Sequence, residues 1–261
     1  ALDWLQAGQT LTQSYVVTVV DSQGAAANQT VSVTITGTND APVITAADLT
    51  GGVTETAGAA STAAPQTALA ASYLTAGNVL VNGLGGTSGF GESTLGSADD
   101  DSTDAIDLTS LFGASGINFF ANNYTSLYLN NNGNITFSSA FGGYDPTSIS
   151  AGVGVPIIAP FWGDVYTRAI SAGGTTPGGN STGSNLLWYD LDSVNGVFTA
   201  TWDDVGYFFE GQKANAFQVQ LINEGNGDFD IVFRYEAINW TAGSASGGVN
   251  GLGGQTARAG Y

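Results

Sequence analysis

Residues 215–237 contain two runs in which apolar and polar side chains alternate, with a short Gly-rich turn between them. In the first run the apolar face holds Phe217, Val219 and Leu221, and the opposite face holds Gln218 and Gln220. In the second run Phe229, Ile231, Phe233 and Tyr235 oppose Asp230, Val232, Arg234 and Glu236. Alternation with period two is typical of a β-strand that buries one face. The two runs therefore predict neighbouring strands whose other face is solvated.

Segments before and within these runs resemble the nidogen-like (NIDO) domain. They are IAPFW (residues 158–162), TWDDVGY (201–207), NAFQ (215–218) and GDFDIVFRYEAINW (227–240). The resemblance covers residues 78–261 and implies an extracellular module of adhesion and matrix proteins, without catalytic residues. We expect an all-β fold, a β-sandwich with aromatic side chains between its sheets, in which residues 127–137 form a hairpin turning at Asn132-Gly133.

Residues 1–45 predict a separate β-hairpin. Alternating runs at 15–20 and 31–36 flank the turn sequence Asp21-Ser22-Gln23-Gly24. The segment is similar to the closing part of a VCBS-type repeat, an immunoglobulin-like sandwich of large bacterial adhesins, most specifically at GTNDAPVI (37–44). Because a lone hairpin is marginally stable in water, its apolar face is expected to pack on another domain or chain. Residues 46–77, rich in Ala, Thr and Ser, are interpreted as a linker.

The chain contains no methionine, so we expect it to be a segment of a longer protein. If both sandwiches are incomplete, a strand of one copy could complete the next, and head-to-tail contacts of this kind would build a filament.

Composition excludes several classes of function. The chain has 22 acidic and four basic residues, a net charge of −18, so it is not expected to bind nucleic acid. No apolar run has the length of a membrane span, so insertion into a bilayer is not expected either. Because histidine and cysteine are both absent, Ser-His-Asp catalysis, Cys-His catalysis and histidine or thiolate zinc sites are excluded.

Calcium is the cation that this acidic composition favours, because its ligands are hard oxygens. The candidate ligands in the segment SADDDSTDAID are Asp99, Asp100, Asp101, Asp104 and Asp107. Asn39 and Asp40 are further candidates, because GTNDAPVI is similar to the calcium-binding linkers of cadherins. The alternative for the acidic segment is an exposed loop that contributes only solubility.

The sequence indicates a structural or adhesive module rather than an enzyme. It is expected at the cell surface or in a biofilm matrix, with other copies of itself, neighbouring adhesin repeats or surface glycans as partners. The first alternative is a carbohydrate-binding module that uses the loop aromatics Phe141, Tyr144 and Tyr166. The second is a carboxylate-based glycoside hydrolase. Its candidate residues are Asp203, Asp204, Glu224, Asp228 and Asp230.

Overall fold

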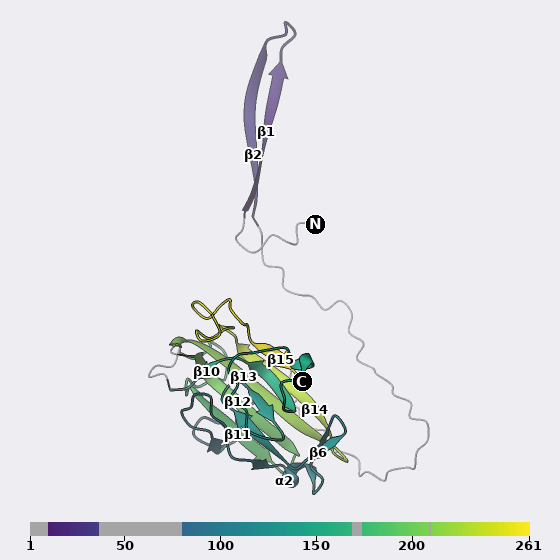
Figure 1. Ribbon diagram of the computed structural model, residues 1–261. Helices are drawn as coiled ribbons and strands as arrows, with labels where there is room; N and C mark the ends of the chain where they lie inside the picture. Colours follow the sequence, from purple (N-terminus) through teal and green to yellow (C-terminus); the bar gives the residue numbers. More distant parts are fainter. Residues whose placement is uncertain (1–9, 37–79, 169–173, 209) are drawn as a thin grey trace, which may run out of the picture. The chain divides into compact units, whose positions relative to one another are not determined.

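The computed structural model describes residues 10–36, 80–168, 174–208 and 210–261 (Figure 1). The chain divides into two units, Ala1–Ser61 and Thr62–Tyr261. The predicted linker at 46–77 lies outside the described residues.

The first unit contains the predicted hairpin, formed by β1 (Thr10–Val20) and β2 (Ala26–Thr36). Its turn is held by the carboxylate of Asp21, whose Oδ1 accepts hydrogen bonds from the backbone N–H groups of Gln23 and Ala25 at 2.8 and 2.9 Å. Gly24 has a φ of +83°, a conformation that glycine adopts without a steric penalty. The hairpin prediction is therefore confirmed for the described residues.

The two faces of the hairpin differ in polarity. Residues paired across the strands lie on the same face, so the register places these apolar side chains together: Leu11, Tyr15, Val17, Val19, Ala27, Val31, Val33 and Ile35. On the other face Thr12 bonds to Thr34 and Ser14 to Ser32. Every residue of both strands is exposed.

The second unit is built from two larger antiparallel sheets. One has the order β14 (Asp228–Ala237), β13 (Glu210–Gly225), β12 (Val197–Tyr207), β11 (Leu186–Asp192) and β3 (Ser93–Thr94), with β10 (Val165–Tyr166) also pairing with β12. The other has the order β15 (Arg258–Gly260), β9 (Ile157–Trp162), β8 (Asn134–Thr136), β7 (Ser126–Asn130) and β4 (Ile106–Asp107). A small sheet is formed by β5 (Ile117–Phe119) and β6 (Asn122–Tyr124), and the short helices are α2 (Thr109–Phe112) and a 3-10 turn at Ile149–Ala151. Within the described residues, no helix is long and apolar enough to cross a bilayer.

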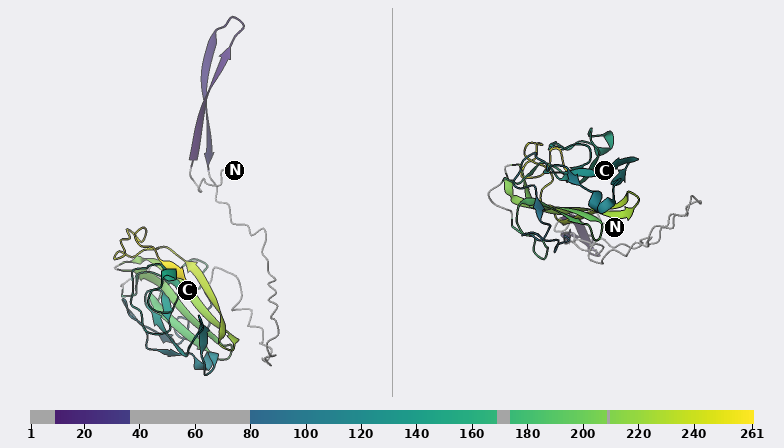
Figure 2. Two further views of the ribbon diagram at one scale, coloured as in Figure 1. Left: turned by 45° about the vertical axis from the view of Figure 1, so that its right-hand side comes forward. Right: turned by 90° about the horizontal axis from the view of Figure 1, so that it is seen from below.

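The two larger sheets pack face to face as the layers of a sandwich, which confirms the predicted all-β fold (Figure 2). The core between them contains Leu129 and Ile135 from one sheet and Phe198, Trp202 and Phe217 from the other. Trp202 and Phe217 are paired in register, and their rings stack with centroids 4.9 Å apart. The predicted hairpin at 127–137 is also present, as β7 and β8.

The outer face of the larger sheet is not solvated at its centre, which corrects the expectation for β13. Gln218 and Gln220 are fully buried. Gln218 Oε1 accepts the N–H of Val81 at 3.1 Å, and its Nε2 donates to the carbonyl of Val81 at 3.0 Å. Val81 also packs on Val197 and Ile222. Gln218 therefore binds a covering segment instead of water, whereas Gln220 forms hydrogen bonds with Thr199 and Arg234 of the neighbouring strands.

Candidate functional site

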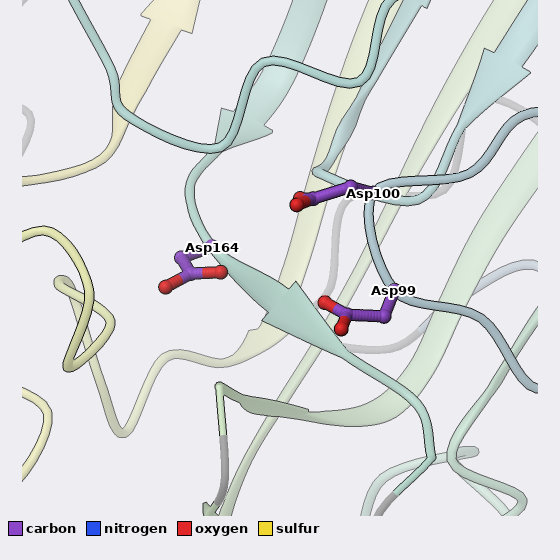
Figure 3. A group of neighbouring side chains, drawn as sticks. All are labelled: Asp99, Asp100 and Asp164. Carbon is purple, nitrogen blue, oxygen red and sulfur yellow. The ribbon is translucent and has the colours of Figure 1, made fainter.

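Three carboxylates from two distant segments come together beside β10. Asp99 forms a β-bridge with Tyr166, and Asp164 directly precedes β10. One carboxylate oxygen from each of Asp99, Asp100 and Asp164 lies within 4.8 Å of the other two. Figure 3 shows the three side chains around one common space, with an oxygen of Asp164 directed toward Asp99 and Asp100. We call these three residues the carboxylate cluster.

The turn between β7 and β8 holds the two acidic segments in place. Asn131 Oδ1 accepts the backbone N–H of Asp100 at 3.1 Å. Asn132 Nδ2 donates to Asp100 Oδ1 at 2.7 Å, and Asn132 Oδ1 accepts the N–H of Val165 at 3.0 Å. Both asparagines are fully buried. Asn132 therefore bridges the segment that carries Asp100 and the residue that follows Asp164.

Asp164 is the most buried member of the carboxylate cluster, with 2% of its surface exposed. Burial raises the pKa of Asp164 to about 7, and repulsion from Asp100, Asp99 and Asp145 adds to the rise. The nearby backbone N–H of Ala245 lowers this pKa in part. Even so, Oδ2 has no hydrogen-bond partner of acceptable geometry among the described residues. The negative charge of this carboxylate is thus poorly compensated.

Asp99 has one cationic neighbour. Arg168 Nη1 lies 3.8 Å from Asp99 Oδ2 in a partly exposed ion pair. Burial and the repulsion of Asp100 raise the pKa of Asp99, and Arg168 lowers it. With all three carboxylates ionised, the single positive charge of Arg168 leaves the carboxylate cluster with a net negative charge, which is an arrangement that could accept a divalent cation.

The structure brings together only two of the five acidic residues that the sequence proposed as ligands. Asp101 and Asp104 are exposed and do not belong to the carboxylate cluster. Asp107 instead ends β4, two residues before α2, and its Oδ1 accepts the N–H of Thr109 at 2.8 Å. This bond lowers the pKa of Asp107. The other two candidates, Asn39 and Asp40, lie outside the described residues.

Sequence reasoning missed Asp164 and the two supporting asparagines. The available signal for Asp164 was its position as the one charged residue in the apolar run 157–166. A charge in such a run needs a partner when the run is buried. The signal for Asn131 and Asn132 was weaker, because an Asn-rich stretch before glycine is common in turns.

A hollow beside the carboxylate cluster has an aromatic wall. Its lining includes Asp100, Asp145, Phe141, Tyr144 and Trp162. Phe141 packs edge-to-face on Trp162 with centroids 5.4 Å apart, whereas Tyr144 is 40% exposed. Of the three loop aromatics proposed to bind sugars, two therefore line this hollow. The third, Tyr166, packs on Phe208 at 5.7 Å and is not part of the lining.

Asp203 and Asp204 hold a loop in place. The register of β12 with β13 shifts between Trp202 and Val205, and Asp204 has a φ of +53°. Both are buried and bind one segment: Asp203 Oδ1 accepts the N–H of Thr182 at 2.8 Å, and Asp204 Oδ2 accepts the N–H of Gly183 at 2.7 Å. Burial raises the pKa of Asp204 to about 6.

The remaining hydrolase candidates lie in exposed positions. Asp228 and Asp230 are exposed on β14, as predicted for its solvated face, and Glu224 is exposed near the end of β13. Glu236, assigned to the same face, is instead partly buried and accepts the N–H groups of Asn180 and Ser181 at 2.6 and 3.0 Å. These acidic residues of the larger sheet thus fall into two groups. Asp203, Asp204 and Glu236 bind backbone N–H groups, and the other three are exposed to solvent.

Comparisons with known proteins agree on one domain. The family model described as the nidogen-like domain matches residues 125–261. The chain is 37% identical over 158 residues to alpha-tectorin of Gallus gallus, covering 55% of this chain and 7% of that protein. It is 31% identical over 147 residues to nidogen of Drosophila melanogaster, covering 50% of this chain and 11% of that protein. The chain thus spans about a tenth or less of the length of these relatives. No solved structure matches it significantly.

Proposed function

The chain belongs to the nidogen-like domain family, and we propose that it is a structural and adhesive module that works outside the cell, in a large bacterial surface or matrix protein. The family resemblance supports an extracellular role. The absence of cysteine fits a bacterial surface protein better than a secreted eukaryotic domain, which usually carries disulfides. The similarity of residues 1–45 to a VCBS-type repeat points in the same direction.

The amphipathic hairpin is the observation that carries the adhesive part of this proposal. Its apolar face presents Tyr15, Val17, Val19, Val31 and Val33 to solvent. Two strands alone are marginally stable in water, and burying such side chains is favourable by about 1.5–3 kcal/mol each. The hairpin therefore gains stability when this face packs on another surface, and we propose a second copy of the chain as that surface.

The acceptor in this proposal is the outer edge of β14. This ten-residue strand pairs only with β13 in the described sheet, so its other edge has backbone groups available for a further strand. The hairpin that is donated and the β14 edge that accepts it are then different surfaces of the chain. Contacts of this type continue from copy to copy and build an open filament rather than a closed dimer.

Replacing Val33 by lysine tests the hairpin. Val33 lies on the apolar face opposite Gln13 and is 46% exposed. We expect wild-type chain to associate at about 100 µM and Val33→Lys to weaken association at least about tenfold, because the contact would bury an ammonium group. Sedimentation velocity gives the mass distribution, and negative-stain microscopy shows whether filaments form.

Val16→Lys is the matched control. Val16 lies on the polar face opposite Thr30 and is 64% exposed, so the same charge there should leave association unchanged. A wild-type chain that stays monomeric, or equal loss in both variants, would contradict the role of the hairpin. Discrete dimers without filaments would contradict the head-to-tail arrangement.

Carbohydrate binding is a second candidate, supported by the aromatic hollow. Tyr144 lines this hollow and offers an exposed ring for stacking on a sugar. A glycan array with wild-type chain should then give hits that Tyr144→Ala loses. Tyr166→Ala is the control, since Tyr166 lies outside the hollow. An array without hits, or hits that survive in Tyr144→Ala, would remove this candidate.

A further inference from the structure

We propose that Asp99, Asp100 and Asp164 bind one calcium ion between the acidic segment and the start of β10. Calcium is bound by oxygens at about 2.3–2.6 Å, so two oxygens on the same ion lie no more than about 5 Å apart. The three carboxylate oxygens, each within 4.8 Å of the others, meet this limit (Figure 3). The site is independent of the proposed adhesive role.

The burial of Asp164 is an independent indication of a ligand. Its side chain is 2% exposed, and one of its carboxylate oxygens is directed toward Asp99 and Asp100. The other side of the carboxylate, where Oδ2 lies against Gly243, has among the described residues only the backbone N–H of Ala245 as partial compensation. An ionised carboxylate that is removed from water requires a counter-charge. Arg168 contacts Asp99 and is partly exposed, so Asp164 still requires a positive charge of its own.

The charges favour a divalent cation. Three carboxylates carry three negative charges, and Arg168 supplies one positive charge beside Asp99. A bound Ca²⁺ would bring the net charge of the three carboxylates and Arg168 to zero. Three carboxylates in one site also favour calcium over magnesium, because magnesium usually retains several waters and takes one or two carboxylates.

The surrounding contacts position the ligands before any ion arrives. Asn132 fixes one oxygen of Asp100 and the N–H of Val165, so the two segments are already tied at a defined distance. Asp100 also lines the hollow, from which water can complete the six to eight ligands of calcium. A site held in this way loses little conformational freedom when it binds the ion.

The test compares the whole 261-residue chain with two matched variants, Asp164→Asn and Asp104→Asn. Both changes replace a carboxylate by an amide of the same shape, but Asp104 is exposed and outside the carboxylate cluster. After removal of metals by a chelator, calcium chloride is titrated while the melting temperature and terbium luminescence are recorded. Terbium replaces calcium at oxygen sites, and Trp162 beside the hollow can sensitise its emission.

For the wild-type chain we expect a dissociation constant of about 0.1–1 mM and a melting temperature about 3–10 °C higher at about 10 mM calcium. Asp104→Asn should respond equally. Asp164→Asn should bind calcium at least about tenfold more weakly. In chelator it should melt no lower than wild type, because the amide removes like-charge repulsion, and this result separates a ligand role from a purely structural one.

Three results would overturn the calcium site. The first is a wild-type chain without a response at about 10 mM calcium, well above the expected dissociation constant. The second is an unchanged response in Asp164→Asn, which would place the ion elsewhere in the chain. The third is an equal or larger response to magnesium chloride. None of these results bears on the association of the hairpin.

Discussion

Replacing Trp202 by alanine is expected to lower the free energy of unfolding of the sandwich unit by about 3–5 kcal/mol. Trp202 is fully buried in the core and stacks on Phe217. Its Nε1 also donates to the carbonyl of Asn131 at 3.0 Å, so truncation leaves a buried acceptor without this bond. The loss is a large fraction of the stability of a typical domain, which is about 5–15 kcal/mol. Urea denaturation followed by circular dichroism measures the change in the free energy of unfolding caused by Trp202→Ala.

Two controls divide this effect into its parts. Trp202→Phe keeps an aromatic ring in the core and removes the hydrogen bond, so it should lose about 1–3 kcal/mol. Tyr144→Ala removes a large aromatic side chain that is 40% exposed, and it should change stability by less than about 1 kcal/mol. A loss below about 1 kcal/mol for Trp202→Ala would show that this side chain does not hold the two sheets together.

The strands were predictable because their signal is local. The alternation around Phe217 and Val219 reports which side chains share a face, and neighbouring residues suffice to read it. The hairpin at residues 10–36 was predictable for the same reason, since both of its strands and its turn are contiguous. These elements depend little on the rest of the chain.

The second face of the larger sheet was mispredicted because the segment that covers it is remote in sequence. Gln218 looked like a solvated residue, yet its partner Val81 lies 137 positions away. A polar side chain can face either water or a backbone that needs hydrogen bonds, and the alternation pattern is identical in both cases. Only the path of the covering segment distinguishes them.

The carboxylate cluster shows the same limit. The acidic segment was predictable as a candidate site. The prediction, however, grouped Asp101, Asp104 and Asp107 with Asp99 and Asp100, because these residues are close in the chain. The fold instead groups carboxylates by strand register. It pairs the backbone of Asp99 with Tyr166 and thereby brings in Asp164.

Gly133→Ala is expected to destabilise the sandwich unit by about 2–5 kcal/mol. Gly133 ends the turn between β7 and β8 with a φ of +78°. A Cβ built there would lie 1.7 Å from the carbonyl oxygen of Phe161 in β9, a contact that only movement of the backbone can relieve. That movement would also break the hydrogen bond from Phe161 N–H to the carbonyl of Gly133.

Gly96→Ala is the matched control for this substitution. Gly96 has a φ of +81° in the same unit, but a Cβ there would meet no atom within 4 Å. Gly96→Ala should therefore lower the free energy of unfolding only by the cost of placing alanine at a positive φ, about 1–2 kcal/mol. The difference between the two variants in urea denaturation measures the steric clash against β9. Equal losses would contradict the close approach of the turn to that strand, and with it the support that Asn132, next to Gly133, gives to the carboxylate cluster.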